Sequence, residues 1–496
     1  MTPPLWLFEL LRGADLLVLG YFLALNTFYL VLLACSAPEL RQHDLLLKED
    51  HLPRLLSTEM LPAVSVLAPA HNEERSIVAS VLSFLTLEYP QHEVVLINDG
   101  SADGTLARLV EAYDLYEVPS TARQALATQP VRAYYRSRRY SRLVVVDKAN
   151  GGKADALNAG LNAARHPYVL AVDADTLVEP DALLRLGRPF LLGQEVAAVA
   201  GTVRVVNACE VAHGRVVRAH VSSRFLAGVQ AVEYLRAYLF GRLGWNRLGG
   251  NLIISGAFGV FRREFVMAVG GYRASSVAED MDLVVRLHRY LKERGIHAAM
   301  PFIPDPVAWT EVPGRLDVLG RQRERWQRGL LATLWQYRAM LCNPRYGRVG
   351  MIAFPFYVFG EALAPVVELL GWALLALGLA IGGVDGAFAP LFFALAYGYG
   401  VLLSLLAVAL EELSFRRYAS VADVGRLVLY ALLEPLGYRQ ITVWHRLRAF
   451  VRVARGDLAW GVMQRDGFGA GQAPAAASTT PPAAAPDAAP DVRRAA

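Results

Sequence analysis

Long apolar segments near both ends of this chain constrain its fold more than any other feature. Residues 16–35 form a predominantly apolar run of about 20 residues, the length that an α-helix needs to cross about 30 Å of hydrocarbon. A cleaved signal peptide would have a basic start and a shorter apolar core, whereas Arg12 and Asp15 precede this run. We therefore expect a retained transmembrane helix within residues 1–36.

Two more apolar blocks, residues 354–382 and 387–410, are each long enough to span a membrane. The loop between them has no Lys or Arg, and arginines flank the outer ends, namely Arg345, Arg348, Arg416 and Arg417. Because positive flanks stay on the cytoplasmic side, residues 37–350 should lie in the cytoplasm. The segment 421–444 contains charged residues and a proline, so it either spans within a bundle or lies at the membrane surface.

Composition excludes several other classes of protein. The net charge of +5 over 496 residues is too dilute to indicate a nucleic-acid partner. The three cysteines are far apart, which excludes a disulfide framework and a zinc cluster and fits a reducing compartment. Residues 470–496 are rich in Ala and Pro, a composition that cannot bury a core and predicts disorder.

The middle of the chain alternates short β-branched runs with segments compatible with helices. This alternation predicts an α/β domain with a mostly parallel sheet, whose ligands bind beyond the carboxyl ends of the strands. The expected strands are residues 64–70, 93–99, 142–148, 168–175 and 197–206.

Polar motifs follow the first two expected strands. The sequence PAHNE occupies residues 69–73 and includes Glu73, and NDGSADGT occupies residues 98–105. Asp103 has the position of a helix N-cap, whereas Asp99 at the strand tip should face a cleft, where it could accept from a base or a ribose. No GxGxxG follows the first strand, which argues against a dinucleotide site.

The next two strands end in motifs that suit a diphosphate and its metal ion. Lys153 follows a Gly-Gly turn at an expected helix start, which could cradle a diphosphate. Asp173 and Asp175 straddle a strand end, where two carboxylates can hold Mg²⁺ or Mn²⁺ with further ligands from phosphate and water. Taken alone, this pair could equally be two turn aspartates.

Two later motifs complete the set. Glu279 and Asp280 open an amphipathic helix, where acidic side chains also complement the helix dipole. The sequence QRERW, residues 322–326, lies in an Arg-rich segment before the second apolar block, and such a segment could also face anionic lipid.

In this order, PAHNE, NDGSADGT, NGGKADALN, DAD, ED and QRERW resemble the motifs of membrane-bound family 2 glycosyltransferases. That family includes the cellulose, chitin, hyaluronan and poly-N-acetylglucosamine synthases. The resemblance covers roughly residues 62–330. It implies a glycosyltransferase A fold, Rossmann-like and inserted between three or four transmembrane helices, with inverting transfer from a nucleotide-diphosphate sugar, usually a UDP-sugar.

The resemblance also implies roles for individual residues. Asp280 would be the general base of the catalytic Glu279–Asp280 pair, and Asp173 and Asp175 would hold the metal. Small residues near the acceptor sugar would be Ser255 and Gly256, with Trp326 beside them. The residues implied at the donor are Glu73, Asp99, Lys153, Asp173, Asp175, Gln322, Arg325 and Trp326.

The chain departs from the family pattern in three places. His71 stands where many members have Tyr, and Asn98 stands where a second Asp is common, so the fine contacts of the donor are open. Residues 118–142 form an Arg-rich insertion without an assigned role, by default a solvated or lipid-facing patch.

Acidic residues in the apolar blocks bear on whether the enzyme exports its product. Glu361 and Glu368 fall on one helix face, and they are either functional or paired with Arg426 or Arg439. Glu411 is expected to be merely juxtamembrane. Three hypotheses follow: a processive synthase that translocates its glycan, a single transfer to a lipid carrier or glycolipid, and an inactive scaffold.

The expected organisation is a multi-pass protein of the cell (inner) membrane with a cytoplasmic catalytic domain, in contact with membrane lipids and without a nucleic-acid partner. Its substrates would be a nucleotide sugar and a growing glycan or lipid acceptor. The expected segments are an N-terminal helix in 1–36, a glycosyltransferase domain in 37–312, interfacial helices in 313–350, a membrane region in 351–450, a juxtamembrane segment in 451–469 and a tail in 470–496.

Overall fold

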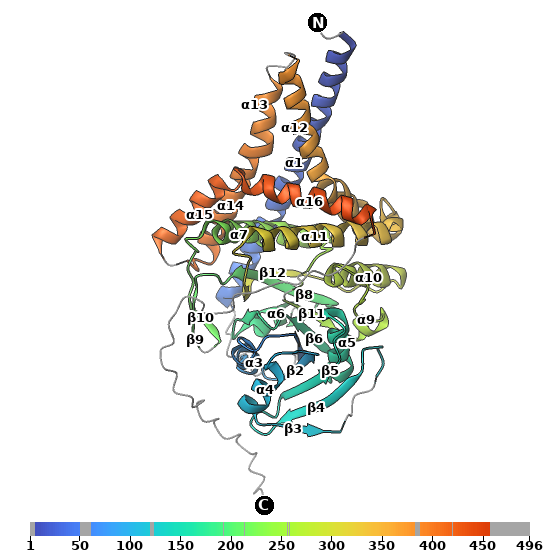
Figure 1. Ribbon diagram of the computed structural model, residues 1–496, viewed down its shortest axis with the longest axis vertical. Coiled ribbons are helices and arrows are strands. Elements are labelled where there is room, and N and C mark those ends of the chain that lie inside the picture. The colour runs from blue at the N-terminus through green and yellow to red at the C-terminus, as the bar shows by residue number, and fades with distance from the viewer. Residues whose placement is uncertain are drawn as a thin grey trace, which may run out of the picture.

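The computed structural model has a sheet domain at one end and a stalk of apolar helices at the other (Figure 1). It describes residues 5–49, 61–119, 124–191, 193–212, 214–254, 256, 258–381, 387–418 and 420–456. The predicted tail and Ser255 lie outside the described residues.

The sheet domain is built on ten strands in the order β3-β4-β5-β2-β1-β6-β11-β8-β12-β7. Their bounds are β1 (Val64–Ala70), β2 (His92–Asp99), β3 (Leu115–Val118), β4 (Val131–Ser137), β5 (Leu143–Lys148), β6 (Tyr168–Val172), β7 (Leu177–Val178), β8 (Ala198–Val205), β11 (Phe258–Arg262) and β12 (Phe302–Thr310). A separate hairpin pairs β9 (Glu210–Ala212) with β10 (Arg215–Arg218).

The α/β class is confirmed, but the sheet is mixed rather than mostly parallel. Strands β5, β2, β1 and β6 are parallel neighbours, while β4 pairs antiparallel with β5 and β11 pairs antiparallel with β6. Both β2 and β8 are buried along their whole length, which fits the apolar run Val94–Ile97 of β2 and the sequence of β8, rich in Val and Ala. The parallel core therefore holds the predicted strand tips at one edge.

The Arg-rich insertion forms strand β4, which lies between β5 and the edge strand β3. Strands β3 and β4 lie at the end of the molecule opposite the apolar stalk (Figure 1). The lipid-facing alternative for residues 118–142 therefore does not hold for the described part of the insertion, because those strands lie far from every candidate membrane helix.

Helices flank the sheet and continue into the stalk. Those of the sheet domain are α3 (Ile77–Leu85), α4 (Thr105–Tyr113), α5 (Lys153–Ala163), α6 (Ala182–Leu191), α9 (Arg263–Ala268) and α10 (Glu279–Glu293). Those between sheet and stalk are α7 (Phe225–Leu235), η1 (Arg236–Arg242), α8 (Leu243–Leu248), α11 (Leu316–Gln336), η2 (Arg338–Met340), η3 (Pro344–Tyr346), α15 (Val421–Leu433) and α16 (Tyr438–Ala454). The apolar ones are α1 (Leu5–Glu49), η4 (Val349–Ala353), η5 (Phe356–Ala362), α12 (Ala364–Ala380), α13 (Phe388–Phe393), η6 (Ala394–Gly398) and α14 (Tyr399–Ser414).

Among the residues that the structure describes, two helices are long and apolar enough to cross a membrane, Glu9–Arg41 and Phe388–Ser414. A third span results if Val349–Ala362 and Ala364–Ala380, which meet at an angle of 42°, are counted together. Pro365 at the start of α12 lacks an N–H and favours such a break. Within the described part of the chain, the two or three candidate spans agree with the lower of the two predicted numbers, three.

The N-terminal helix runs to Glu49, beyond the expected boundary at residue 36. Its polar continuation contacts the sheet side of the molecule, where Glu39 pairs with Arg247 of α8 at 3.0 Å. The segment 421–444 is not one continuous helix, because α15 ends at Leu433 and α16 begins at Tyr438. Both helices lie across the base of the stalk (Figure 1), the arrangement of the surface alternative.

Helix α11, which carries QRERW, is largely buried rather than exposed to lipid. Twelve of its residues are buried, including Gln322 and Arg323. Helix α16 packs over it, and Gly320 of α11 lies so close to the ring of His445 that a Cβ there would approach within 2.2 Å. The lipid-facing alternative for this helix is therefore wrong along most of its length.

Candidate active site

The ends of β2 and β5 meet at a tight contact that requires glycine. Gly100 has φ +63°, and a Cβ at this position would lie 2.6 Å from the amide nitrogen of Asn150. This contact brings the loop after β5 against Asp99. The Asp99 carboxylate accepts hydrogen bonds from the amides of Gly151 at 3.0 Å and Gly152 at 2.8 Å. Asp99 therefore organises the loop that precedes Lys153.

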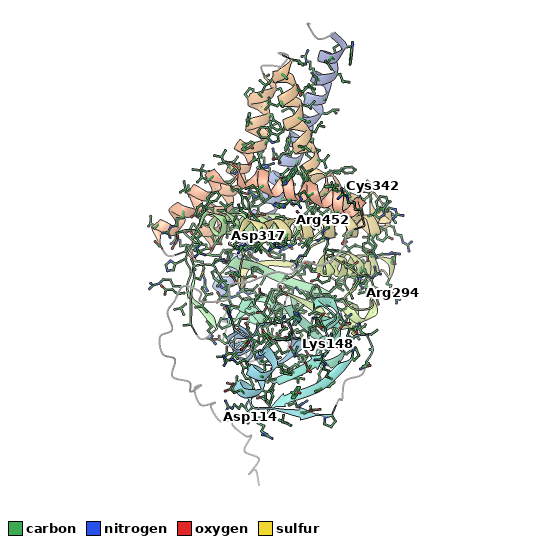
Figure 2. The ribbon with its side chains drawn as sticks, in the orientation of Figure 1. Asp114, Lys148, Arg294, Asp317, Cys342 and Arg452 are labelled. Carbon is green, nitrogen blue, oxygen red and sulfur yellow. The ribbon has the colours of Figure 1, made fainter. Side chains whose placement is uncertain are left out.

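A buried lysine that the motif analysis did not select completes this arrangement. Lys148 at the end of β5 is fully buried, and its Nζ lies 2.5 Å from Asp99, 2.6 Å from Asp155 and 2.6 Å from the carbonyl of Ala149. Figure 2 shows it inside the sheet domain, far from Asp317 on α11. An ammonium group directs three donors to three acceptors, which a planar guanidinium does not do in the same space. The signal was present in the sequence, because Lys148 is one of only four lysines in an Arg-rich chain.

The structure explains why Asn, not Asp, precedes Asp99. The side-chain amide of Asn98 donates to the carboxylate of Asp147 on the neighbouring strand at 2.7 Å, and both residues are buried. A second Asp at position 98 would place two carboxylates in contact away from water.

We expect Asn98→Asp to destabilise the folded domain by about 1–3 kcal/mol or more at neutral pH, because a donor is replaced by a repelling charge. Unfolding of the detergent-solubilised protein, followed by circular dichroism, measures this loss. Asn98→Ser, which loses the hydrogen bond without adding a charge, is the matched control. The loss should shrink as the pH falls and the new carboxyl group is protonated. A stability equal to that of the serine variant at every pH would contradict the explanation.

Lys153 connects three motifs. Its Nζ lies 2.5 Å from Asp173 and 3.6 Å from Glu279, and it donates to the carbonyl of Gly256 at 2.8 Å. Burial lowers the pKa of Lys153, but the carboxylates of Asp173 and Glu279 outweigh burial, so the net pKa is raised and the side chain stays charged. A fixed positive charge therefore lies between the DxD and ED motifs.

The ED motif places one buried and one partly exposed acid at the start of α10. Burial raises the pKa of Glu279, and so does the neighbouring Asp280, although Lys153 opposes this shift. Asp280 is partly exposed and lines a cavity of about 710 Å³, hereafter the central cavity. Its place at the wall leaves it accessible to a substrate hydroxyl, whereas Glu279 contacts Lys153.

Gly256 lies directly against Asp280. A Cβ at position 256 would approach Oδ2 of Asp280 within 2.8 Å, so only glycine leaves the carboxylate in place. Gly256, Asp173 and Asp280 all line the central cavity. The predicted small residue thus touches the predicted base.

We expect Gly256→Ala to lower the rate of catalysis at least 10-fold with little loss of stability, because the methyl group displaces the end of a flexible side chain. Gly425→Ala serves as the control, since a Cβ there meets no atom within 4 Å and Gly425 does not line the central cavity. Steady-state kinetics and thermal unfolding of both variants test this expectation. A Gly256→Ala enzyme with an unchanged rate would show that the position of Asp280 tolerates the added methyl group.

The DxD aspartates offer two hard oxygen ligands at the end of β6. Asp175 is buried, and Asp173 is partly exposed and paired with Lys153. Among the described residues no group of three or more His, Cys, Asp or Glu side chains gathers around one point. The two carboxylates of Asp173 and Asp175 therefore fit Mg²⁺ or Mn²⁺ only if a diphosphate and water supply the remaining ligands.

The QRERW motif faces the same cavity from α11. Gln322, Arg325 and Trp326 line it, together with Asp280 and Glu279. Trp326 is 42% exposed, while Arg323 beneath it is buried. Of the remaining predicted site residues, Glu73, Asp99, Lys153 and Asp175 do not line this cavity. Glu73 accepts a hydrogen bond from Ser76 in the loop after β1, and the end of β1 lies beside the end of β2, which carries Asp99.

The central cavity extends from Asp280 into the apolar helices. Glu368 of α12 lines it and pairs with Arg439 of α16 at 2.8 Å, which settles the choice between Arg426 and Arg439. Glu361 also lines it and accepts from Tyr29 of α1 at 2.8 Å. Both acids predicted to share a helix face therefore face the cavity, and Glu368 is also paired.

The environment of Glu411 differs from the prediction that this residue is merely juxtamembrane. Glu411 is fully buried, and it pairs with the equally buried Arg204 of β8 at 2.5 Å. This pair joins the end of α14 to the catalytic sheet. Sequence reasoning missed it because the two residues are more than 200 positions apart.

Comparison with known proteins agrees with this geometry. Residues 128–329 match the family model described as glycosyltransferase like family 2. Poly-β-1,6-N-acetyl-D-glucosamine synthases from Staphylococcus epidermidis (strain ATCC 35984) and Staphylococcus aureus (strain COL) are 27% and 28% identical. The alignments cover 59% and 55% of this chain and 60% and 56% of those proteins, so the chain matches little more than half of their length.

A mannosyltransferase from Pyrobaculum calidifontis, solved with GDP-Man and Mn²⁺, matches 84% of this chain and 99% of its own, with a TM-score of 0.45 and 18% identity. The mixed sheet, the order of the motifs and the family match agree with one another. Residues 128–329 therefore match a glycosyltransferase domain of family 2.

Proposed function

We propose that this protein is a membrane-integrated, inverting glycosyltransferase that uses a UDP-sugar to extend a β-linked polysaccharide and passes the product into the membrane. One observation carries the proposal: a single cavity reaches from Asp280 and Trp326 to Glu368 and Arg439 among the apolar helices. A glycan extended at Asp280 would enter this cavity directly. The curated relatives are named as poly-β-1,6-N-acetyl-D-glucosamine synthases, so UDP-N-acetylglucosamine is the first donor to test.

The proposed transfer assigns a role to each group at the site. An acceptor hydroxyl attacks the anomeric carbon of the donor as the bond from that carbon to the diphosphate oxygen breaks. Asp280 accepts the hydroxyl proton, since a neutral hydroxyl is a weak nucleophile. The charge that develops on UDP is stabilised by Lys153 and by the bidentate guanidinium of Arg325.

A divalent ion would be held by Asp173 and Asp175. When bound, such an ion supplies positive charge to the diphosphate of the leaving UDP. In this proposal Asp99 acts on the donor through the loop of Gly151 and Gly152, whose amides it holds, rather than by touching uridine. Trp326 presents an aromatic face on which the acceptor sugar stacks.

The proposed location follows from the distribution of charge. Arginines flank the apolar helices on the side of the sheet domain, so the catalytic domain lies in the cytoplasm of a multi-pass inner-membrane protein. Helices α15 and α16 lie at the membrane surface, where exposed apolar side chains such as Leu432 and Trp444 meet lipid.

The second candidate function is a single transfer of a sugar to a lipid carrier. The apolar part of the cavity wall favours this function. Phe22, Leu25 and Leu32 of α1 line the same cavity, and such a wall would also accept a lipid chain. The product distinguishes the two functions. Intact Asp173, Asp175 and Asp280 argue against an inactive scaffold.

The deciding experiment uses the full chain in lipid nanodiscs with UDP-N-acetylglucosamine, UDP-glucose and UDP-glucuronic acid in the presence of Mn²⁺. UDP release and product mass are followed together. Polymer retained by the nanodisc supports the proposal, and a lipid bearing one sugar supports the second candidate. Absence of UDP release with every donor would overturn both.

A further inference from the structure

Arg323, the second residue of QRERW, lines the central cavity and also contacts the tryptophan of the motif. Its guanidinium lies over the ring of Trp326 at 4.5 Å from the centroid. Residues three apart on a helix face the same side, so α11 itself brings the two side chains together. The ring remains 42% exposed and lines the central cavity.

The guanidinium is held from two other helices. Arg323 donates to both carboxylate oxygens of Glu233 on α7, at 2.6 and 2.7 Å, and to the hydroxyl of Tyr438 on α16 at 3.1 Å. The Tyr438 hydroxyl in turn donates to Glu233 at 2.6 Å. Burial raises the pKa of Glu233, but Arg323 and Tyr438 outweigh burial and lower it, so the carboxylate remains charged. We call these three residues the Arg323 clamp.

This geometry is more than a salt bridge between helices. A bidentate pair fixes the plane of the guanidinium. A guanidinium held in this way stacks on the indole ring of a tryptophan in one orientation. A lysine at the same position would keep the charge but lose both the fork and the plane. The clamp therefore holds the guanidinium plane of Arg323 against the ring of Trp326.

We propose that Arg323 is a positioning residue that sets the Trp326 platform for the acceptor sugar, with Glu233 and Tyr438 as its supports. The inference rests on the proposed acceptor role of Trp326. It adds that processive extension depends on a clamp joining α7, α11 and α16. Changes in the Arg323 clamp should therefore alter the binding of the acceptor sugar. They should not alter the binding of the donor, because the Gly-Gly loop and Lys153 do not involve these residues.

The test compares Arg323→Lys with Arg321→Lys in nanodiscs. Arg321 lies on the same helix, is half-exposed and pairs with Asp317 at 3.2 Å, so it is a matched control. We expect Arg323→Lys to lower kcat/KM for added N-acetylglucosamine oligosaccharide about 5- to 30-fold and to shorten the polymer. The KM for UDP-N-acetylglucosamine should stay unchanged, while the melting temperature should fall because the bidentate pair with Glu233 is lost. Equal polymer lengths in the two variants would overturn the proposal.

A double-mutant cycle asks whether Arg323 acts through Trp326. In a Trp326→Ala background the further change Arg323→Lys should have no additional effect on acceptor kcat/KM, whereas additive losses would overturn the proposal. If Arg323→Lys does not fold, the pair R323M/E233L replaces the buried ion pair by apolar side chains and should retain the fold. The pair should shorten the polymer as the lysine variant does, and full-length polymer would count against the clamp. Wild-type protein that releases no UDP would instead refute the proposed function.

Discussion

Replacing Asp280 by Asn is expected to lower the rate of sugar transfer by about 10²- to 10⁴-fold, the range for loss of a general base. Asparagine keeps the size and one oxygen of the side chain, so the contact with Gly256 is preserved. It cannot accept the proton of the attacking hydroxyl. The affinity for UDP should stay within about threefold of wild type, since the groups that hold the diphosphate are unchanged.

Isothermal titration with UDP and initial-rate measurements on the same preparation separate these two effects. Glu264→Gln is the control, because Glu264 lies in the same domain with its side chain 71% exposed and pairs with Arg262 at 3.2 Å. Glu279→Gln should behave differently from Asp280→Asn, because it removes a charge facing Lys153 and therefore affects binding as well as rate. If Asp280→Asn weakens UDP binding as much as it slows transfer, Asp280 holds the donor and another group is the base.

The strand tips could be predicted from the sequence because each motif directly follows a buried, β-branched run. Parallel strands bring their carboxyl ends to one edge, so the sequence predicts Asp99, Lys153 and Asp173 at one site. Lys153 and Asp173 indeed lie 2.5 Å apart. The order of the motifs along the chain is enough to predict this proximity, because neighbouring parallel strands place successive motifs side by side.

Side-chain partners across long sequence separations could not be predicted in the same way. The sequence predicts that Asp99 faces a cleft, but not that its carboxylate accepts a hydrogen bond from Lys148, 49 residues away. The choice of Arg439 over Arg426 as the partner of Glu368 depends on the break between α15 and α16, which turns Arg439 toward α12. Such pairs depend on how the helices pack. The hydropathy of one segment does not show which other segment packs against it.

The antiparallel edges of the sheet were missed for a related reason. Strand β4 has a mixed pattern of buried and exposed residues, and its arginines resemble a solvated loop. It becomes a strand because β5 offers an unpaired edge, with Tyr134 packing into the core. Tertiary context outweighs local propensity at this position.

Removing either DxD carboxylate should weaken metal binding and lower the rate of the reaction. Asp173→Asn and Asp175→Asn each take one negative charge from the only two ligands that the chain offers in this proposal. Loss of supporting contacts around a metal typically costs 10- to 100-fold, so loss of a direct ligand should lower activity by more than about 100-fold at fixed Mn²⁺. The half-saturating Mn²⁺ concentration should rise in both variants.

Two measurements check this expectation: activity against buffered free Mn²⁺, and UDP binding with Mn²⁺ or with EDTA. Wild type should bind UDP more tightly with the metal, and the variants should show little difference between the two conditions. Asp181→Asn is the control, a nearby carboxylate that pairs with Arg185 at 2.6 Å outside the site. The Lys153 ammonium already neutralises part of the charge on Asp173, so Lys153→Met should strengthen Mn²⁺ binding while slowing transfer. Full activity of the wild-type protein in EDTA would mean that Lys153 and Arg325 alone carry the diphosphate charge.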